Sequence, residues 1–279
     1  MPSLQEEKGH GCCADEKSIL AAEKVRFSYH NSGFELGPVD LALEAGEILG
    51  IIGPNGSGKT TMLRLLSGFL RPESGRLYLN GGDIRHLKPH LMAKILGFVP
   101  SQSPATFPFR SIEIVMMGRL PHLPFLRSES SKDEDIARRA MGATDTAHLA
   151  DRYFNELSGG ERQRVMIAMS LAQEPSVLLL DEPTSHLDIS HIVTVFDVLV
   201  SLARDSKMAI ALVLHDLNLA SEYCDKLLLM RAGKVEALGR PDDVLSVENI
   251  KSVFRAEVAI HENPATGAPF VFPVSRHRR

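Results

Sequence analysis

Nine consecutive residues carry the strongest chemical pattern in the sequence. They follow an apolar stretch at residues 48–52 and precede a helix-like stretch at residues 62–66, the strand–loop–helix context of a phosphate-binding P-loop. Glycines let the backbone curl so that successive N–H groups point at one anion, and the following helix adds its positive end. These nine candidate nucleotide-binding residues are Gly53, Pro54, Asn55, Gly56, Ser57, Gly58, Lys59, Thr60 and Thr61.

Two side chains at the end of this loop have the types that phosphoryl chemistry needs. Lys59 is placed to reach the β- and γ-phosphates of a nucleotide, and the Thr60 hydroxyl is placed to hold Mg²⁺. A glycine-rich turn that binds nothing is the alternative, but the strand before the loop and the helix after it argue against that interpretation. The spacing therefore predicts a site for ATP and Mg²⁺.

A second group of polar residues follows the continuous apolar run at residues 177–180. Such a run is typical of a parallel strand buried on both faces, and Asp181 and Glu182 end it. Adjacent strand residues point to opposite faces, so one carboxylate can serve the Mg²⁺ shell and the other an attacking water. His215 ends the next buried strand, and a histidine there is either structural or part of the same site.

Ser158 begins a helix that we expect to extend to about residue 175. Glu161 stands three residues further on, which is the spacing of a capping box. Gly159 and Gly160 are costly in a helix, but they leave backbone N–H groups exposed, as an anion requires. The stretch is therefore either only a capped helix or a second anion site.

The apolar periodicity of the chain predicts the elements that must position these groups. Strands are predicted at residues 25–29, 39–43, 46–52, 76–79, 97–100, 177–180, 208–214, 226–230 and 234–237. Helices are predicted at residues 87–96, 112–118, 133–141, 147–153, 158–175, 189–203 and 218–223. Residues 88–157 should thus form a mostly helical insertion, and the apolar alternation of residues 257–274 allows a small hairpin.

Three features leave alternatives open. Tyr29 ends the first predicted strand, where it either stacks on an adenine ring or is an ordinary strand residue. Residues 101–109 contain prolines and exposed-looking aromatics, so they form either a contact surface or a packed loop. Cys12 and Cys13 lie in a glycine-rich terminus that either binds a metal or, more simply, is a disordered tail.

The composition limits the class of protein. The chain has 279 residues, 44% hydrophobic residues and a formal net charge of -4, which argues against a general nucleic-acid binder. No apolar run approaches the ~18–20 residues that a membrane span needs, and the polar N-terminus does not resemble a secretory signal. We expect a cytoplasmic protein with reduced cysteines and with Cys224 in the core.

Taken in order, the motifs resemble those of ATP-binding cassette (ABC) ATPases. The matching stretches are residues 53–60, Gln102, residues 157–161, 178–182 and 185–188, and His215, and the resemblance covers about residues 22–255. It implies an α/β fold with a P-loop NTPase (RecA-like) core, an antiparallel β subdomain and a helical subdomain at about residues 88–157. A flexible tail at residues 1–20 and an extension at residues 256–279 would flank residues 21–255.

This resemblance also implies roles for the site residues. Two copies would clamp two ATP molecules head to tail, with Ser158, Gly159 and Gly160 of one copy facing the γ-phosphate bound by the other. Tyr29 would stack on the adenine, Glu182 would polarise the attacking water, and Asp181 would bind Mg²⁺ through a water. His215 and Gln102 would contact the γ-phosphate or the water, and Gln102 would also sense Mg²⁺ and the membrane partner. Asp188 would link the two sites.

A narrower resemblance rests on residues 98–102, 117–122, 184–188 and 214–220. These stretches are similar to those of importer ATPases for iron-siderophore, haem and cobalamin, although Ser101 departs from the proline that is usual there. The resemblance implies a peripheral subunit on the cytoplasmic face of the cell membrane. Its partners would be transmembrane permease subunits, a periplasmic or surface substrate-binding protein reached through the permease, and a second copy.

Other classes of ATPase account for the sequence less well. A soluble ABC ATPase that acts on nucleic acid or ribosomes would favour tandem cassettes, a long coiled-coil insertion or a basic surface. A P-loop kinase would have no use for residues 158–161 or for His215. An exporter is disfavoured because no transmembrane segment is fused to this cassette. We therefore expect a separate membrane permease as the partner and no nucleic-acid partner.

Overall fold

The computed structural model describes residues 18–30, 33–101, 108–123, 129–185 and 187–275. Its continuous apolar runs form a six-stranded sheet in the order β10-β9-β3-β8-β7-β6. Every residue of β3, β7 and β8 is buried, as expected for parallel strands covered on both faces. The strands are β3 (Ile48–Ile52), β6 (Leu96–Val99), β7 (Val177–Asp181), β8 (Ala209–Val213), β9 (Lys226–Arg231) and β10 (Lys234–Gly239).

Five of these six strands are parallel, and their register sets where the polar residues lie. β7 lies between β6 and β8, and Asp181 pairs with Val213 at the last position of both strands. β3 pairs with β8 and β9, while β10 is the antiparallel edge strand. The loops after β3, β7 and β8 therefore leave the sheet at one edge, where ligands of such sheets lie.

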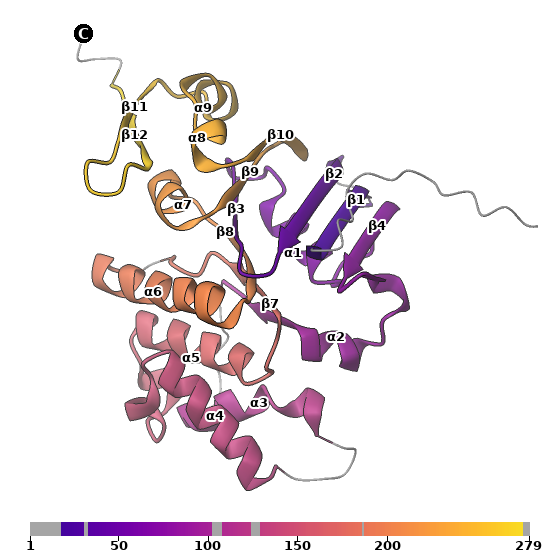
Figure 1. The fold of residues 1–279 in the computed structure, drawn as a ribbon, viewed down its shortest axis with the longest axis vertical. Helices are drawn as coiled ribbons and strands as arrows, with labels where there is room; N and C mark the ends of the chain where they lie inside the picture. Colours follow the sequence, from indigo (N-terminus) through magenta and orange to yellow (C-terminus); the bar gives the residue numbers. More distant parts are fainter. Residues whose placement is uncertain (1–17, 31–32, 102–107, 124–128, 186, 276–279) are drawn as a thin grey trace, which may run out of the picture.

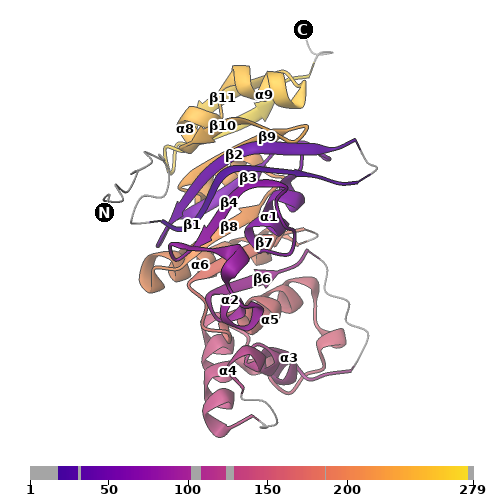
Figure 2. The ribbon, with the colours of Figure 1, turned by 90° about the vertical axis from the view of Figure 1, so that its right-hand side faces the viewer.

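A second, antiparallel sheet packs on one face of this core. Its order is β2-β1-β4-β5, with β1 (Ser18–Ser28), β2 (Glu35–Glu44), β4 (Ser74–Leu79) and β5 (Gly82–Asp83). Side chains from this sheet, from α1 (Lys59–Leu66) and from one face of β3, β7 and β8 form one apolar cluster. Figure 2 shows the ribbons of β1, β2 and β4 lying in front of the central strands, with α1 beside them. The predicted α/β fold with an antiparallel subdomain is confirmed, although β1 begins earlier than the predicted strand at residues 25–29.

The opposite face of the central sheet is covered by α5 (Gly159–Leu171), α6 (Ile189–Ser206) and α7 (Leu217–Tyr223). Figure 1 shows α5 with α3 (Ser111–Met117) and α4 (Ser131–Ala143) gathered at one end of the molecule. The segment at residues 88–157 is not purely helical. It begins with α2 (Pro89–Ile95) and then contributes β6 to the central sheet.

The predicted helix at residues 147–153 is wrong. Only a 3-10 turn, η3 (Ala147–Leu149), forms there. The reason is that the backbone of residues 150–154 bonds to the segment that starts α3: Ser111 N–H donates to Arg152 O at 2.9 Å, and Phe154 N–H donates to Phe109 O at 2.9 Å. These bonds across the subdomain replace the bonds that a longer helix would make.

The C-terminal part forms α8 (Pro241–Val244), α9 (Val247–Phe254) and a hairpin of β11 (Val258–Glu262) and β12 (Pro269–Pro273). The hairpin packs on α7, where Asn218 bonds to both backbone groups of Val271 and Ser221 Oγ donates to Pro269 O at 2.6 Å. Cys224 is buried as predicted, whereas Cys12 and Cys13 lie outside the described residues. Within the described ranges, no helix combines the length and apolar character of a membrane span.

Candidate functional site

An open cavity of about 400 Å³ lies where the loops after β3, β7 and β8 meet. Its walls come from four separate parts of the chain, which the sheet brings to one place. Nine predicted site residues line it: Tyr29, Asn55, Gly56, Gly58, Lys59, Thr60, Thr61, Glu182 and His215. The predicted convergence of the P-loop with the carboxylate and histidine strand ends is therefore present in the structure.

Residues 53–60 require glycine at two positions for steric reasons. Gly53 has φ 148°, and a Cβ there would lie 2.2 Å from Met230 O. Gly58 has φ 104° and caps the start of α1, where a Cβ would lie 2.8 Å from the Phe34 ring. A side chain at either position would shift the loop relative to strand β9 or to the Phe34 ring. These two glycines therefore set the shape of the phosphate-binding loop at residues 53–60, which we call the cradle.

Lys59 crosses the loop that precedes it. Its ammonium donates hydrogen bonds to Gly53 O at 2.9 Å and to Pro54 O at 3.1 Å. Burial lowers the pKa of Lys59 below its usual 10.5, and the nearby carboxylates of Glu182 and Asp181 only partly offset this effect. A buried ammonium with incomplete charge compensation is well suited to receive an anion such as a phosphate group.

Thr60 and Asp181 form a pair of oxygen donors beside Lys59. Thr60 Oγ1 donates to Asp181 Oδ1 at 3.2 Å, and the carboxylate is only 6% exposed. Burial raises the pKa of Asp181, although the hydrogen bond from Thr60 acts in the opposite direction. A hydroxyl and a carboxylate are hard oxygen ligands, so the pair fits a Mg²⁺ ion that keeps several waters.

Glu182 directly follows this pair and has a left-handed backbone, with φ 50°. Its two carboxylate oxygens accept hydrogen bonds from His215 Nε2 at 2.6 Å and from Ser185 Oγ at 3.0 Å. Partial burial alone would raise the pKa of Glu182, but these two bonds and the charge of Lys59 outweigh it and lower the pKa. The side chain is thus a fixed carboxylate at neutral pH, and its uncommon backbone conformation is typical of functional sites.

An aromatic wall closes one side of the cavity. The hydroxyl of Tyr29 lies 3.2 Å from Thr61 Oγ1, and the Tyr29 and Phe34 rings are 6.2 Å apart. Phe34 also lines the cavity and was not predicted. It directly precedes β2 and stands five residues after Tyr29, and this short spacing between two aromatic residues is the signal that could have identified it.

Ser158, Gly159 and Gly160 do not line this cavity. Ser158 caps α5 and exchanges the predicted capping-box bonds with Glu161, at 2.8 and 3.3 Å. Helix α5 lies on the face of the sheet opposite α1, so the helix start does not reach the P-loop of its own chain (Figure 1).

Asp188 lies with this helix start and not with the cavity. It caps α6, and its carboxylate bonds to His191 Nδ1 at 2.7 Å. The His191 ring packs against Gly160, where a Cβ would lie 2.3 Å from the ring. Hydrogen bonds from the backbone N–H of His191, and then from the side chains of Ser190 and His191, lower the pKa of Asp188 to about 2. Gln102, the remaining predicted site residue, is outside the described residues.

Comparison with known proteins agrees with this geometry. A family model described as ABC transporter matches residues 36–185. The chain is 42% identical over 255 residues to the hemin import ATP-binding protein HmuV of Myxococcus xanthus, covering 89% of this chain and 94% of the relative. It is 40% identical over 231 residues to the ferric enterobactin transport ATP-binding protein FepC of Escherichia coli, covering 83% of this chain and 85% of the relative.

The fold has a similarly close counterpart among solved structures. A metal-chelate type ABC transporter, solved in an inward-facing conformation, matches with a TM-score of 0.83 and 30% sequence identity. The match covers 93% of this chain and 98% of the other.

Proposed function

The chain belongs to the ABC transporter family of ATPases, as the order of its motifs predicted, and from this membership we propose that it energises the import of a metal chelate through a separate membrane permease. The chelate would be an iron-siderophore, haem or cobalamin. The cargo class is supported by the relatives, which are named for hemin and ferric enterobactin, and by the metal-chelate transporter structure. The observation that carries the ATPase activity is the meeting of Lys59, Glu182 and His215 in one cavity.

ATP would bind with its adenine against Tyr29 and Phe34 and its phosphates in the cradle of residues 53–60. The ammonium of Lys59 would exchange its loop carbonyls for phosphate oxygens, which relieves the uncompensated burial of its charge. Thr60, and Asp181 through a water, would hold Mg²⁺, and Gln102 would approach the same ion. Bound Mg²⁺ would neutralise charge on the β- and γ-phosphates.

Hydrolysis would begin at Glu182. Its carboxylate would accept a proton from the attacking water, while His215 holds the carboxylate in place and contacts the γ-phosphate or the water. Ser185 fixes the second carboxylate oxygen, so the base has little rotational freedom. Most of the acceleration would then come from positioning and electrostatic stabilisation, as is general for phosphoryl transfer.

A second copy of the chain would complete each site. The start of α5 lies outside the cavity of its own chain, with Ser158 and Gly159 exposed and Gly160 buried beside His191. The N-terminus of a helix favours an anion. In a head-to-tail homodimer it would face the γ-phosphate held by the other copy, and Asp188 would link the two sites. Release of phosphate would remove this bridge and open the dimer.

The remaining assignments follow from the importer role. We propose that residues 21–255 form the ATPase domain, with residues 1–20 as a tail and residues 256–279 as an extension. The chain would sit on the cytoplasmic face of the cell membrane, bound to transmembrane permease subunits. A substrate-binding protein would deliver cargo to the permease from outside, and no nucleic acid would take part.

Affinity purification from native membranes tests this proposal. The tagged full chain should bring down a many-helix permease in gently solubilised membranes, and the permease should capture a substrate-binding protein whose ligand names the cargo. Recovery of only a nucleic-acid-binding or ribosomal partner would leave the ATPase chemistry intact and reject the transport role.

Tyr29 should contribute to nucleotide affinity through its ring and not through its hydroxyl. We expect Tyr29→Ala to weaken ATP binding by roughly tenfold, because base–aromatic stacking is worth about 1–3 kcal/mol. Tyr29→Phe keeps the ring and removes the hydroxyl that contacts Thr61, so its affinity should stay within about twofold of the original by the same stacking argument. Equilibrium binding of a fluorescent ATP analogue measures both. Unchanged affinity in Tyr29→Ala would make Tyr29 an ordinary strand residue.

Phe109 is our candidate for contact with the permease, together with Phe107 and Pro108. Phe107 lies outside the described residues, whereas Phe109 is 39% exposed and lies just before α3. We expect Phe109→Asp to abolish cargo uptake while ATP binding persists, because a buried charge at an apolar interface is strongly unfavourable. Phe272→Asp, a 44% exposed phenylalanine on the C-terminal hairpin, is the matched control. Normal uptake by Phe109→Asp would remove this docking proposal.

A further inference from the structure

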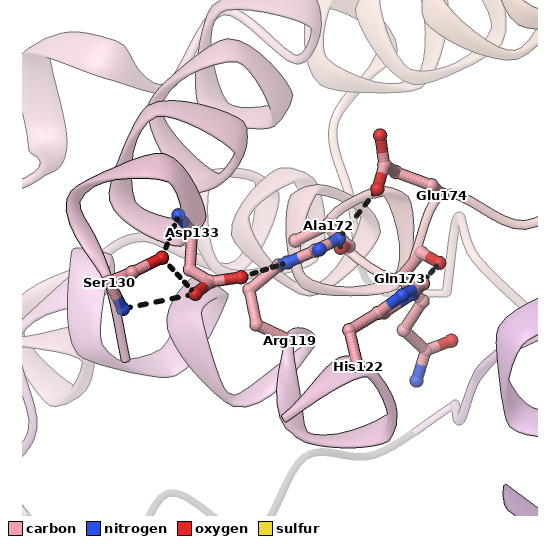
Figure 3. Close-up of polar contacts among 7 residues, drawn as sticks. All are labelled: Arg119, His122, Ser130, Asp133, Ala172, Gln173 and Glu174. Atoms are coloured by element: carbon pink, nitrogen blue, oxygen red, sulfur yellow. Dashed lines mark hydrogen bonds and ion pairs between the residues drawn. The ribbon is translucent and has the colours of Figure 1, made fainter. Parts of the chain in front are cut away.

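Residues 117–122 take no part in the nucleotide cavity, although they carry part of the resemblance to metal-chelate importers. They end α3 and form the 3-10 turn η2 (Leu120–His122). Figure 3 shows that the side chains of Arg119 and His122 point at the last turn of α5. The stretch therefore has a structural partner that its own sequence does not reveal.

Arg119 joins three elements with one side chain. Its guanidinium donates to Asp133 Oδ1 in the first turn of α4 at 3.1 Å and to Ala172 O at the end of α5 at 2.6 Å. It also pairs with Glu174 Oε2 at 2.9 Å, just after α5. The residue is only 4% exposed, so these partners surround a buried guanidinium whose planar group of N–H donors fixes the direction of each bond.

The neighbouring residues of the stretch hold the same helix end. His122 Nε2 donates to Gln173 O at 2.8 Å, next to the carbonyl that Arg119 binds. Gly118 packs so closely on α5 that a Cβ there would lie 2.1 Å from Met169 O. The last carbonyls of a helix lack partners within the helix and carry its negative dipole end, so a cation and an N–H donor are the groups that bind them best.

Asp133 is itself fixed, which makes the anchor rigid. Its other oxygen accepts hydrogen bonds from Ser130 N at 3.0 Å and from Ser130 Oγ at 2.6 Å, closing a capping box at the start of α4. These bonds, with that from Arg119, hold the pKa of Asp133 at about 2, so the pair stays ionised across the physiological range. The end of α3, the start of α4 and the end of α5 thus meet at one guanidinium.

The other end of α5 is the proposed anion site at residues 158–160. A helix is stiff along its axis, so fixing its end at Ala172 also fixes the axial position of its start at Ser158. At that far end, the segment before Ser158 is bonded to the start of α3, beside Phe109. Helix α3 therefore spans from the proposed permease contact to the anchor that sets where α5 sits.

We propose that Arg119, supported by Gly118 and His122, is a positioning residue for hydrolysis: it sets the position of α5 so that residues 158–160 of one copy meet the ATP held by the other. This inference rests on the proposed head-to-tail function. It gives residues 117–122 a role in hydrolysis without contact with nucleotide. It also separates two steps, because ATP binding in the cavity of the same chain does not use α5.

Arg119→Lys is the sharpest test, because it keeps the charge while one ammonium cannot make the fork of bonds to Asp133 and Ala172 O together. In the purified chain–permease complex, we expect kcat for ATP to fall by at least about tenfold, since small misplacements of catalytic groups have effects of this size. KM, the ATP affinity of the isolated chain and its Tm should change little. Arg138→Lys, an exposed arginine of α4 paired with Glu134, is the control.

His122 supplies a graded second variant. His122→Gln keeps an N–H donor for Gln173 O and should retain most of kcat, whereas His122→Ala should lower kcat in the direction of Arg119→Lys. Unchanged kcat in Arg119→Lys would overturn the proposal. A fall in kcat accompanied by equal losses in Tm and ATP affinity would also overturn it, since Arg119 would then only stabilise the fold. Because ATP turnover is the readout, a wrong cargo leaves this test intact. Absence of a permease complex, or of ATPase activity in the original chain, identifies failure of the proposed function instead.

Discussion

Glu182→Gln is expected to lower ATP turnover by at least about a hundredfold, the scale of general-base catalysis, while ATP still binds. The amide keeps the size of the side chain and can still accept the hydrogen bond from His215 through its oxygen. It loses the negative charge and the ability to take a proton from water. The change therefore removes chemistry and leaves the cradle at residues 53–60 untouched.

Loss of turnover without loss of binding should trap an intermediate. With Mg²⁺ and ATP, we expect Glu182→Gln to elute as a dimer in size-exclusion chromatography, while the original chain returns to the monomer as it hydrolyses ATP. Glu248→Gln, an exposed carboxylate in the first turn of α9, is the matched control and should behave as the original. Near-normal hydrolysis by Glu182→Gln would show that another group activates the water.

The state of Glu182 before the change makes this prediction sharp. Its pKa lies below the usual value because the bonds from His215 and Ser185 outweigh burial, so the base is already ionised at neutral pH. Its neighbour Asp181 has a raised pKa because of burial, and it accepts a hydrogen bond from the Thr60 hydroxyl instead of from a histidine. Two adjacent carboxylates thus have different environments, which supports the predicted division between metal binding and base catalysis.

The sequence predicted the cavity well because its residues end elements with strong local patterns. Lys59, Glu182 and His215 each follow a buried apolar strand, and adjacent parallel strands end at the same edge of a sheet. The central sheet was predictable for the same reason. Strand β6 was also expected, yet its membership of that sheet depends on pairing with β7, about 80 residues away.

The parts that were not predicted depend on distant partners. The partners of Arg119 at the end of α5 and just after it lie 53 and 55 residues further along the chain, and no local periodicity encodes such contacts. The expected helix at residues 147–153 failed because its backbone bonds instead to residues near 111. Phe34 was missed because its role comes from its place beside the Tyr29 ring in the folded chain, which no local pattern encodes. Local propensity yields to tertiary hydrogen bonding in such places.

We expect Lys59→Met to keep or raise the thermal stability of the nucleotide-free chain and to weaken its binding of ATP. Burial lowers the pKa of Lys59, which means that its charged form costs the folded chain some stability. Methionine has a similar length and no charge, so the Tm of the nucleotide-free chain should stay the same or rise. A residue that mainly supported the fold would instead lower the Tm when replaced.

Binding of ATP should show the opposite effect. A ligand at 100 times its Kd stabilises the folded state by about 2.7 kcal/mol, which is a readily measured rise in Tm. Lys59→Met removes the only lysine that lines the described cavity and should abolish most of that rise together with hydrolysis, because charge-assisted bonds are each worth about 1.5–3 kcal/mol.

Thermal unfolding with and without Mg²⁺ and ATP measures both parts of this prediction in one experiment. Lys251→Met, an exposed lysine on α9, controls for the loss of a charge and should keep the full ATP-dependent rise. If Lys59→Met kept that rise, the phosphates would not lie in the cradle at residues 53–60. If it lost the rise only because the nucleotide-free chain unfolded early, Lys59 would hold the loop carbonyls of Gly53 and Pro54 for the sake of the fold. The expected results are an unchanged or higher Tm without nucleotide and no rise in Tm with ATP. Only a lysine whose buried charge serves to bind phosphate, and not to stabilise the fold, gives both.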